Sequence, residues 1–318
     1  MRSVQVAIFV CLILTLMIIL DHTFTQIVPT NTVVKNYWLL SKKKESYDMA
    51  FIGPSRVLHS IDCEVFEQRH KGKAINLGLS GVGYAEQYLV LRRLLEENEV
   101  KIKQLFIEVS YYNLIDPDSA FSYPFHEYYY FPYIQTDYVY ELIKDNSKKR
   151  YKSWAWKNIP FMRYAEYNSN FRPLVLFTST LREGSGDSEF DKYGTIYLNE
   201  ASKEEVFKPH YYTNSEMNEK TILYLEKMIA LAKRNSTEVI LFTSPVYSKV
   251  VSFDKKTLLN YKNTVNRIVS ENKLEYYDFE HHVLCDSIAN FYDVTHLNKR
   301  GAIMFSQNLS DSLLAINE

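Results

Sequence analysis

The sequence predicts an α/β protein: a three-layer α/β/α sandwich around a mostly parallel five-stranded sheet. Five short apolar runs, 47–53, 73–78, 104–110, 238–244 and 276–279, have the length and composition of buried strands. Most are separated by segments whose apolar residues recur every three or four positions, as on one face of a helix. Such alternation is typical of βαβ units, whose parallel strands end at a common edge where ligands bind.

The chain begins with a strongly apolar segment. Residues 4–20 (VQVAIFVCLILTLMIIL) follow Arg2 and include no charged side chain. These 17 residues are fewer than the roughly 20 of a membrane-spanning helix but more than the roughly 7–15 of a signal-peptide core. No small-residue cleavage site follows, so we favour an uncleaved anchor over residues 1–20. Because the first basic cluster, 42–44, lies far beyond it, we expect the N-terminus in the cytoplasm and the rest outside.

Residues 21–45 are predicted to be a polar connector to a domain over residues 46–318. The first strand of this domain ends on Gly53 and leads into a helix over about 56–69. After the second strand, the segment 84–97 has apolar residues four, three and four positions apart, which indicates a second helix.

Residues 116–210 interrupt the alternation between the third and fourth strands. The segment is rich in Tyr, Phe and Trp, and several prolines divide it into short pieces. A structureless loop of this length is implausible in a compact domain. We therefore expect an aromatic-rich helical insertion, either a lid or a subdomain.

The later part of the chain returns to the alternating pattern. Helices with one apolar face are predicted over about 222–232 and 258–268, and from about residue 299 to the end. They flank the fourth and fifth strands. This completes the elements of the predicted sandwich.

Composition excludes several classes of protein. The net charge of -1, from 37 basic and 38 acidic residues, gives no reason to expect nucleic-acid binding, which depends on basic contacts to phosphate. With 46% hydrophobic and 24% charged residues, the chain is neither disordered nor fully embedded in a membrane. Cys63 and Cys285, the two cysteines beyond the apolar segment, fit one disulfide or two free buried thiols equally well.

Gly53, Ser55 and Arg56 follow the first strand directly. Glycine at a strand end permits a tight turn, which would place the Ser55 hydroxyl over the sheet at the start of a helix. Free N–H groups at that point suit a developing oxyanion. Serine is also a common helix cap, so the segment by itself allows both roles. Arg56 is a candidate pocket residue, with a structural role as the alternative.

Two further loops are predicted at the same edge of the sheet. The loop after the second strand holds three of the nine glycines, Gly78, Gly81 and Gly83. The backbone N–H of Gly81 is a candidate oxyanion donor, although an ordinary turn explains the loop equally well. After the third strand, the side-chain amide of Asn113 is a candidate further donor, although asparagine is also a common turn residue.

Asp293 and His296 lie three residues apart just before the last helix. The carboxylate could orient the imidazole, whose other nitrogen could then take a proton from a serine. The pair by itself could equally be a polar contact, a cap or half of a metal site. The other histidines do not complete a metal site, so we expect no metal and no cofactor. The α/β-hydrolase elbow Gly-x-Ser-x-Gly is excluded because Val57 stands at its last position.

Together these residues resemble the blocks of the SGNH/GDSL hydrolase superfamily. Gly53-Pro54-Ser55 stands at the Gly-Asp-Ser block, residues 76–81 (NLGLSG) resemble the glycine block, and residues 293–298 (DVTHLN) resemble the closing block. Gly-x-Ser-Arg and Asp-x-x-His-Leu-Asn are similar to a membrane-anchored subgroup that handles acetyl groups of bacterial surface polysaccharides and teichoic acids. The third block departs from the pattern, because Tyr112 stands at the expected asparagine and Asn113 follows it.

The resemblance implies a serine esterase or O-acetyltransferase acting on a carbohydrate polymer of the cell envelope. Ser55 would be the nucleophile, His296 the general base and Asp293 the group that orients it. Water and sugar remain open as acceptors, and transfer would imply a multi-spanning membrane acyltransferase as partner. The competing hypothesis is a catalytically silent polysaccharide-binding or assembly factor on the same scaffold. A lipid esterase is a third possibility because the insertion is apolar.

Overall fold

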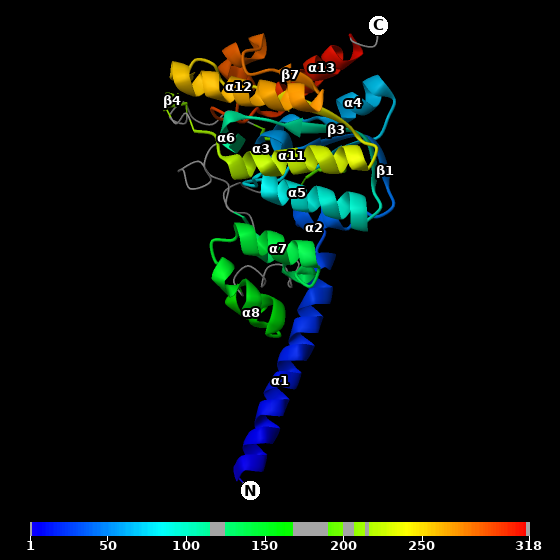
Figure 1. Ribbon diagram of the computed structural model, residues 1–318. Helices are drawn as coiled ribbons and strands as arrows, with labels where there is room; N and C mark the ends of the chain where they lie inside the picture. Colours follow the sequence, from blue (N-terminus) through cyan, green and yellow to red (C-terminus); the bar gives the residue numbers. More distant parts are fainter. Residues whose placement is uncertain (1, 115–124, 168–189, 200–206, 214–215, 316–318) are drawn as a thin grey trace. The chain divides into compact units, whose positions relative to one another are not determined.

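The computed structural model describes five stretches of the chain, which fall into two compact units (Figure 1). One unit contains the chain up to Ser41 together with residues 125–167 of the insertion, and the other contains the remaining described residues. The described stretches are residues 2–114, 125–167, 190–199, 207–213 and 216–315.

The unit that begins at Lys42 is built on a five-stranded sheet in which every neighbouring pair of strands is parallel. The strand order is β2-β1-β3-β5-β7. The predicted α/β class and the five-stranded parallel sheet are therefore confirmed. The strands are β1 (Ser46–Ile52), β2 (Ala74–Asn76), β3 (Lys101–Glu108), β5 (Glu238–Thr243) and β7 (Glu275–Asp278).

The apolar runs of the sequence form strands because helices cover both faces of the sheet. The last four residues of β1 and of β3 are buried without interruption, as expected of central parallel strands. Strand β7, at the sheet edge, instead has exposed residues at both ends, Glu275 and Asp278, and two half-buried tyrosines between them. Phe51, Phe106 and Phe242 belong to one apolar cluster on one face of the sheet.

Two sets of helices form the outer layers (Figure 1). The first set packs on the apolar cluster that contains Phe51, and its members contact one another. The second set covers the opposite face, where α11 packs on both α5 and β5. The first set is α3 (Ser55–Ser60), α4 (Cys63–His70) and α13 (Lys299–Leu314), and the second is α5 (Tyr84–Arg92), α11 (Glu219–Arg234) and α12 (Lys255–Asn272).

Three local features differ from the predicted elements. The predicted helix 56–69 is two helices, because Asp62 caps α4 by accepting hydrogen bonds from the N–H groups of Glu64 and Val65. The predicted helix 84–97 is α5 followed by a π-helical turn over Arg93–Glu97. A separate two-stranded parallel sheet, β4 (His210–Tyr212) with β6 (Val251–Phe253), was not predicted, since three-residue strands leave little pattern in a sequence.

The other unit consists of the N-terminal segment and short helices of the insertion. Residues 21–45, predicted as a polar connector, are largely helical, because apolar side chains such as Tyr37 and Leu39 are buried there. Parts of the predicted insertion (116–124, 168–189 and 200–206) lie outside the described residues. The helices of this unit are α1 (Arg2–Ile27), η1 (Val28–Thr30), α2 (Lys35–Leu40), η3 (Glu127–Tyr133), α7 (Asp137–Asn146), η4 (Arg150–Lys152), α8 (Ser153–Asn158) and α9 (Met162–Glu166).

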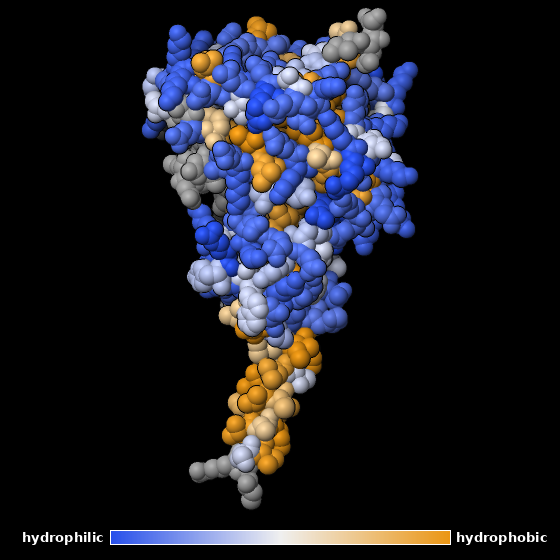
Figure 2. Space-filling view, in the orientation of Figure 1, coloured by the Kyte–Doolittle hydropathy of each residue, from blue (hydrophilic) through white to orange (hydrophobic). Residues whose placement is uncertain are grey.

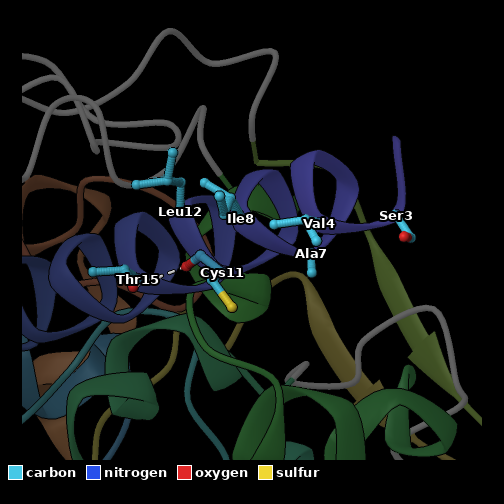
Figure 3. Close-up of a pocket in the computed structure, with 7 residues that line it drawn as sticks. All are labelled: Ser3, Val4, Ala7, Ile8, Cys11, Leu12 and Thr15. Atoms are coloured by element: carbon cyan, nitrogen blue, oxygen red, sulfur yellow. Dashed lines mark hydrogen bonds between the residues drawn. The ribbon is translucent and has the colours of Figure 1, made fainter. Parts of the chain in front are cut away.

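Helix α1 has the length and composition of a membrane anchor or a signal sequence. The apolar helical stretch is 28 residues long, Ser3–Thr30, and its N-terminal part is exposed and hydrophobic (Figure 2). Figure 3 shows a shallow hollow on this part, formed by side chains of α1 alone, including Val4, Ala7 and Cys11. The hollow is therefore a feature of one helix surface and not an enclosed binding site.

Candidate active site

Close packing at the end of β1 positions Ser55. A Cβ atom added to Gly53 would lie 2.3 Å from Cγ2 of Val57, and one added to Gly78 would lie 2.5 Å from the backbone N of Leu58. Glycine at both positions therefore lets the loops after β1 and β2 approach α3 closely. Ser55 is the first residue of α3 and is half-buried.

Asn76, at the end of β2, fixes the backbone of α3 from the side. Its side-chain amide donates to the carbonyl oxygen of Val57 at 2.9 Å, and its side-chain oxygen accepts from the N–H of Gly78 at 2.8 Å. Buried amides of this kind are satisfied on both sides, which makes their position specific. The resemblance of residues 76–81 to the glycine block therefore has a physical basis in the support of α3.

Ser55, His296 and Asp293 form a continuous chain of hydrogen bonds. The hydroxyl oxygen of Ser55 lies 2.8 Å from Nε2 of His296, and Nδ1 of His296 lies 2.8 Å from Oδ2 and 3.0 Å from Oδ1 of Asp293. With Nδ1–H donating to the carboxylate, Nε2 is free to accept the Ser55 proton. The structure thus brings together the three residues that the sequence proposed as nucleophile, base and orienting group.

A tight loop fixes the positions of Asp293 and His296 relative to each other. The N–H of Tyr292 donates to the carbonyl oxygen of His296 at 2.8 Å, and an antiparallel bridge joins Phe291 to Leu297. Inside the loop, Oδ1 of Asp293 accepts from the backbone N–H groups of Thr295 at 2.8 Å and His296 at 2.9 Å. The carboxylate therefore holds both the loop backbone and the imidazole.

These contacts keep Asp293 ionised. Burial alone would raise the pKa of the Asp293 carboxyl, but the hydrogen bond and charge of His296 and the N–H groups of the loop lower its pKa to about 2. A permanent carboxylate beside Nδ1 favours the tautomer that leaves Nε2 unprotonated. The electrostatics of the loop thus match those of a general base held in one orientation.

The backbone N–H groups of Ser55 and Gly81 are the two candidate oxyanion donors of the sequence. Within the described part of the chain, no hydrogen bond uses the N–H of Ser55 or of Gly81. Gly81 has a φ of 69°, which favours glycine over residues with a Cβ. The positive φ gives a conformational reason for glycine at this position, beside its candidate role as an oxyanion donor.

Asn113 and Arg56 are turned toward buried partners. The amide of Asn113, in α6 (Tyr111–Leu114), donates to Oε2 of Glu108 at 2.8 Å, and among the described residues no hydrogen bond joins it to Ser55, His296 or Asp293. Arg56 pairs with Oε1 of Glu108 at 3.3 Å and donates to the carbonyl oxygen of Ser244. Only 3% of the Arg56 side chain and 0% of that of Glu108 are exposed, which favours the structural alternative for Arg56.

The buried carboxylates around Arg56 are perturbed by their surroundings. Burial raises the pKa of Glu108, and the charge of Arg56 opposes this rise. Burial also raises the pKa of Glu280, with a further rise from Asp278 and an opposing effect of Arg56. Arg56 therefore compensates buried negative charge beneath the sheet edge.

His59 is a residue near the site that the sequence did not single out. Its ring stands almost perpendicular to that of His296, with 5.5 Å between the centroids, and Nδ1 donates to the carbonyl oxygen of Ile196 at 2.8 Å. His59 follows Ser55 by four residues in the same helix, and this i, i+4 spacing was the signal available in the sequence.

The remaining chemistry-bearing residues add no metal site or disulfide. Cys63 and Cys285 are buried thiols that form no disulfide, so the structure favours separate buried thiols over the disulfide. Burial raises the pKa of the Cys285 thiol to about 11. Within the stretches that the structure describes, no group of three or more His, Cys, Asp and Glu side chains could hold a metal ion.

Comparison with known proteins yields only distant structural likenesses. No protein-family model matches the chain, and no curated protein is significantly similar to it. Among solved structures, the chain is similar to one described as a "putative acylhydrolase" from Bacteroides fragilis, with 11% sequence identity and a TM-score of 0.40. The likeness covers 88% of this chain and 96% of that one. At this level the likeness concerns the α/β architecture alone.

Proposed function

We propose that the protein is a serine-dependent O-acyl esterase or O-acetyltransferase of the SGNH type, acting on a carbohydrate polymer of the cell envelope. The observation that carries the proposal is the 2.8 Å separation between the Ser55 hydroxyl and Nε2 of His296, whose Nδ1 is held by Asp293. A nucleophile, a base and an orienting carboxylate in this order form the constellation used for acyl transfer on several unrelated folds.

In the proposed mechanism, the Ser55 oxygen attacks the carbonyl carbon of an ester while Nε2 of His296 takes the hydroxyl proton. The N–H groups of Ser55 and Gly81 are proposed to stabilise the oxyanion of the tetrahedral intermediate. Imidazolium formed at His296 then protonates the leaving sugar oxygen, and the acyl group remains on Ser55. Attack by water, or by a hydroxyl of a second sugar, releases it with His296 again acting as base.

The substrate class follows from the motif resemblance and the composition of the insertion. Residues 125–167 are rich in Tyr, Phe and Trp, whose rings offer apolar faces with a polar edge suited to sugars. Hydrolysis and transfer share the acyl-enzyme, so either outcome is compatible with the triad. Transfer would require an acyl donor delivered across the membrane, for which a multi-spanning membrane acyltransferase is the proposed partner.

We further propose that α1 is a retained anchor, with the catalytic unit outside the cytoplasm. Support comes from the contacts that α1 makes just after the apolar run of residues 4–20. Asp21 accepts from Arg163 at 2.8 Å and from the N–H of Phe161 at 2.8 Å, and only 3% of the Arg163 side chain is exposed. Cleavage of α1 after Asp21, beyond the apolar run, would remove this carboxylate and leave the buried guanidinium of Arg163 without it, which is costly.

A fluorophosphonate probe tests the proposed nucleophile directly. We expect wild-type protein to be labelled at Ser55, and Ser55→Ala to lose both labelling and turnover of an aryl acetate. Removing a triad member typically reduces rate by several orders of magnitude. Ser287→Ala, at an exposed serine, is the matched control and should behave as wild type. Unchanged turnover in Ser55→Ala would disprove the mechanism.

The second candidate function is a catalytically silent polysaccharide-binding or assembly factor. The observation that favours it is the commitment of Asn113 to Glu108, which removes the third donor that the motif resemblance implies. The fluorophosphonate result separates the two functions, because a silent scaffold has no reason to activate Ser55. If labelling is seen, mass spectrometry of an acetylated glycan with and without acyl donor distinguishes loss of ester from gain.

A further inference from the structure

We propose that the insertion, residues 125–167, rests on the membrane surface from which α1 emerges, and that residues 148–154 contact anionic lipid headgroups there. The proposal depends on α1 being a retained anchor. It does not depend on the acyl-transfer chemistry. All of the residues concerned belong to one compact unit.

The first step is that the insertion is fixed to one face of α1. Residues 3–16 of α1 are exposed, whereas Met17, Leu20, Asp21 and Phe24 are half-buried. Their spacings of three, one and three place them on one side of the helix. The covered side of α1 therefore begins within the apolar stretch.

Specific contacts hold this face. The ring of Phe24 lies 5.2 Å from that of Phe161 and 5.4 Å from that of Tyr164, measured between centroids. The hydroxyl groups of Thr25 and Tyr164 lie 2.9 Å apart. Together with the ion pair between Asp21 and Arg163, these contacts fix the insertion at a defined height along α1.

The second step is to place the part of α1 that contacts the insertion relative to a lipid bilayer. The apolar run Val4–Leu20 has 17 residues, which rise about 26 Å in a helix. A bilayer hydrocarbon core is roughly 30 Å thick. The run falls only a few Å short of this thickness, so its end at Leu20 and Asp21 lies close to the headgroup level. The insertion contacts α1 at Asp21 and Phe24, and half-buried Met17 lies on the same side of the helix, so the end of the insertion nearest Met17 reaches the headgroups.

The third step is the chemistry of that end of the insertion. Between Asp145 and Glu166 the sequence has six Lys and Arg residues and no acidic residue. In Figure 1, α8 lies at the end of the unit from which the bare stretch of α1 emerges. Tyr151 is 77% exposed and Trp154 is 63% exposed. Exposed Trp and Tyr are typical of membrane interfaces, and clustered Lys and Arg bind anionic lipids.

Some of these cations already have carboxylate partners within the unit. Lys152 lies 2.7 Å and Lys149 lies 3.4 Å from Glu166. Lys148 and Arg150 are exposed on either side of Lys149. The lipid contact is therefore assigned to Lys148 and Arg150 for charge, and to Tyr151 and Trp154 for insertion into the interface.

Lipid quenching of tryptophan fluorescence tests the contact in the full-length protein. The chain has three Trp residues, so the difference between wild type and Trp154→Phe isolates Trp154. In phospholipid nanodiscs, brominated lipid should quench wild type, and Trp154→Phe should lose most of that quenching. Aqueous iodide should quench Trp154 in detergent but much less in discs. Equal lipid quenching in the two proteins, with iodide reaching Trp154 in discs, would overturn the proposal.

Charge reversal tests the preference for anionic lipid. In Lys148→Glu/Arg150→Glu we expect loss of the extra quenching that phosphatidylglycerol gives over phosphatidylcholine alone. Lys144→Glu, at an exposed lysine outside the segment, is the matched control and should retain it. If acetylated polysaccharide, and not brominated lipid, changes the Trp154 signal, the surface binds glycan and the proposal is wrong. Failure of full-length protein to enter discs would instead refute α1 as an anchor, leaving the fluorophosphonate test of Ser55 unaffected.

Discussion

The rings of His59 and His296 meet edge to face, with an interplanar angle of 83° and 5.5 Å between their centroids. His59 is held in turn by its hydrogen bond to the carbonyl oxygen of Ile196. The imidazole proposed as general base is thus oriented by Asp293 at one nitrogen and packed by a second ring at its side. We infer that His59 is a positioning residue, since its ring packs against the imidazole of His296.

Two substitutions of His59 separate ring packing from hydrogen bonding. His59→Phe keeps a ring beside His296 but loses the contact to Ile196, whereas His59→Gln keeps a donor but loses the ring. We expect His59→Gln to lower kcat about tenfold at unchanged KM, because a loosely held base is misplaced more often. His59→Phe should stay close to wild type. Equal activity in both variants, with equal rates of fluorophosphonate labelling, would show that the ring contact has no positioning role.

Asp293→Asn is expected to affect both rate and stability. The variant removes the charge that selects the His296 tautomer, and in comparable triads this lowers kcat by about 10⁴-fold. Because the pKa of Asp293 is lowered to about 2 in the folded protein, the ionised carboxylate also stabilises the fold at neutral pH, by about 2 kcal/mol.

The coupling between ionisation of Asp293 and the stability of the fold can be tested by changing the pH. A lowered folded-state pKa means that the stabilisation is complete above the unfolded pKa, near 4, and is lost as pH falls toward about 2. Urea unfolding of wild type and Asp293→Asn should therefore differ at pH 7 and converge at acidic pH. A difference that stays constant across this range would mean that the charge of Asp293 does not contribute to stability.

The fold and the grouping of Ser55, His296 and Asp293 were predictable because both depend on the order of the strands. Uninterrupted apolar runs mark the central strands, and parallel strands end at one edge, so Ser55 and the loop from Asp293 to His296 are placed near each other by topology alone. The strands could be predicted from the local sequence pattern. The hydrogen bonds that join Ser55, His296 and Asp293 could be identified only in the folded structure.

The side-chain directions of Arg56 and Asn113 could not be predicted from the local sequence pattern. The direction of the Arg56 side chain depends on Ser244, 188 residues later, and on Glu108 at the end of β3. The sequence places Arg56 beside Ser55 but does not say that a buried carboxylate will attract it away from the surface. The same carboxylate accepts a hydrogen bond from Asn113, which was a candidate oxyanion donor because it follows the third strand.

Asn113→Ala tests this reassignment. If Asn113 only satisfies Glu108, its loss should lower the free energy of unfolding by about 1–3 kcal/mol, since a buried carboxylate loses a donor, and should change kcat little. An oxyanion donor would instead cost about 10²–10³-fold in kcat. Gln87→Ala, which removes another buried amide, one that donates to the carbonyl oxygen of Val82, controls for loss of packing. A large fall in kcat at unchanged stability would restore Asn113 as an oxyanion donor.

The ion pair between Asp21 and Arg163 should determine how firmly the insertion is held on α1. Asp21→Asn keeps the shape of the side chain but leaves the buried Arg163 without a countercharge, so we expect amide hydrogens over Met162–Glu166 to exchange faster. Adding Arg163→Met to this variant removes the unpaired charge and should restore much of the protection. Hydrogen exchange of the full-length protein in nanodiscs measures both effects, with α13 as an internal reference in the other unit. If Asp21→Asn leaves exchange unchanged, the pair does not hold the insertion. Equal protection losses in the single and double variants would show that packing around Arg163, and not its charge, is what matters.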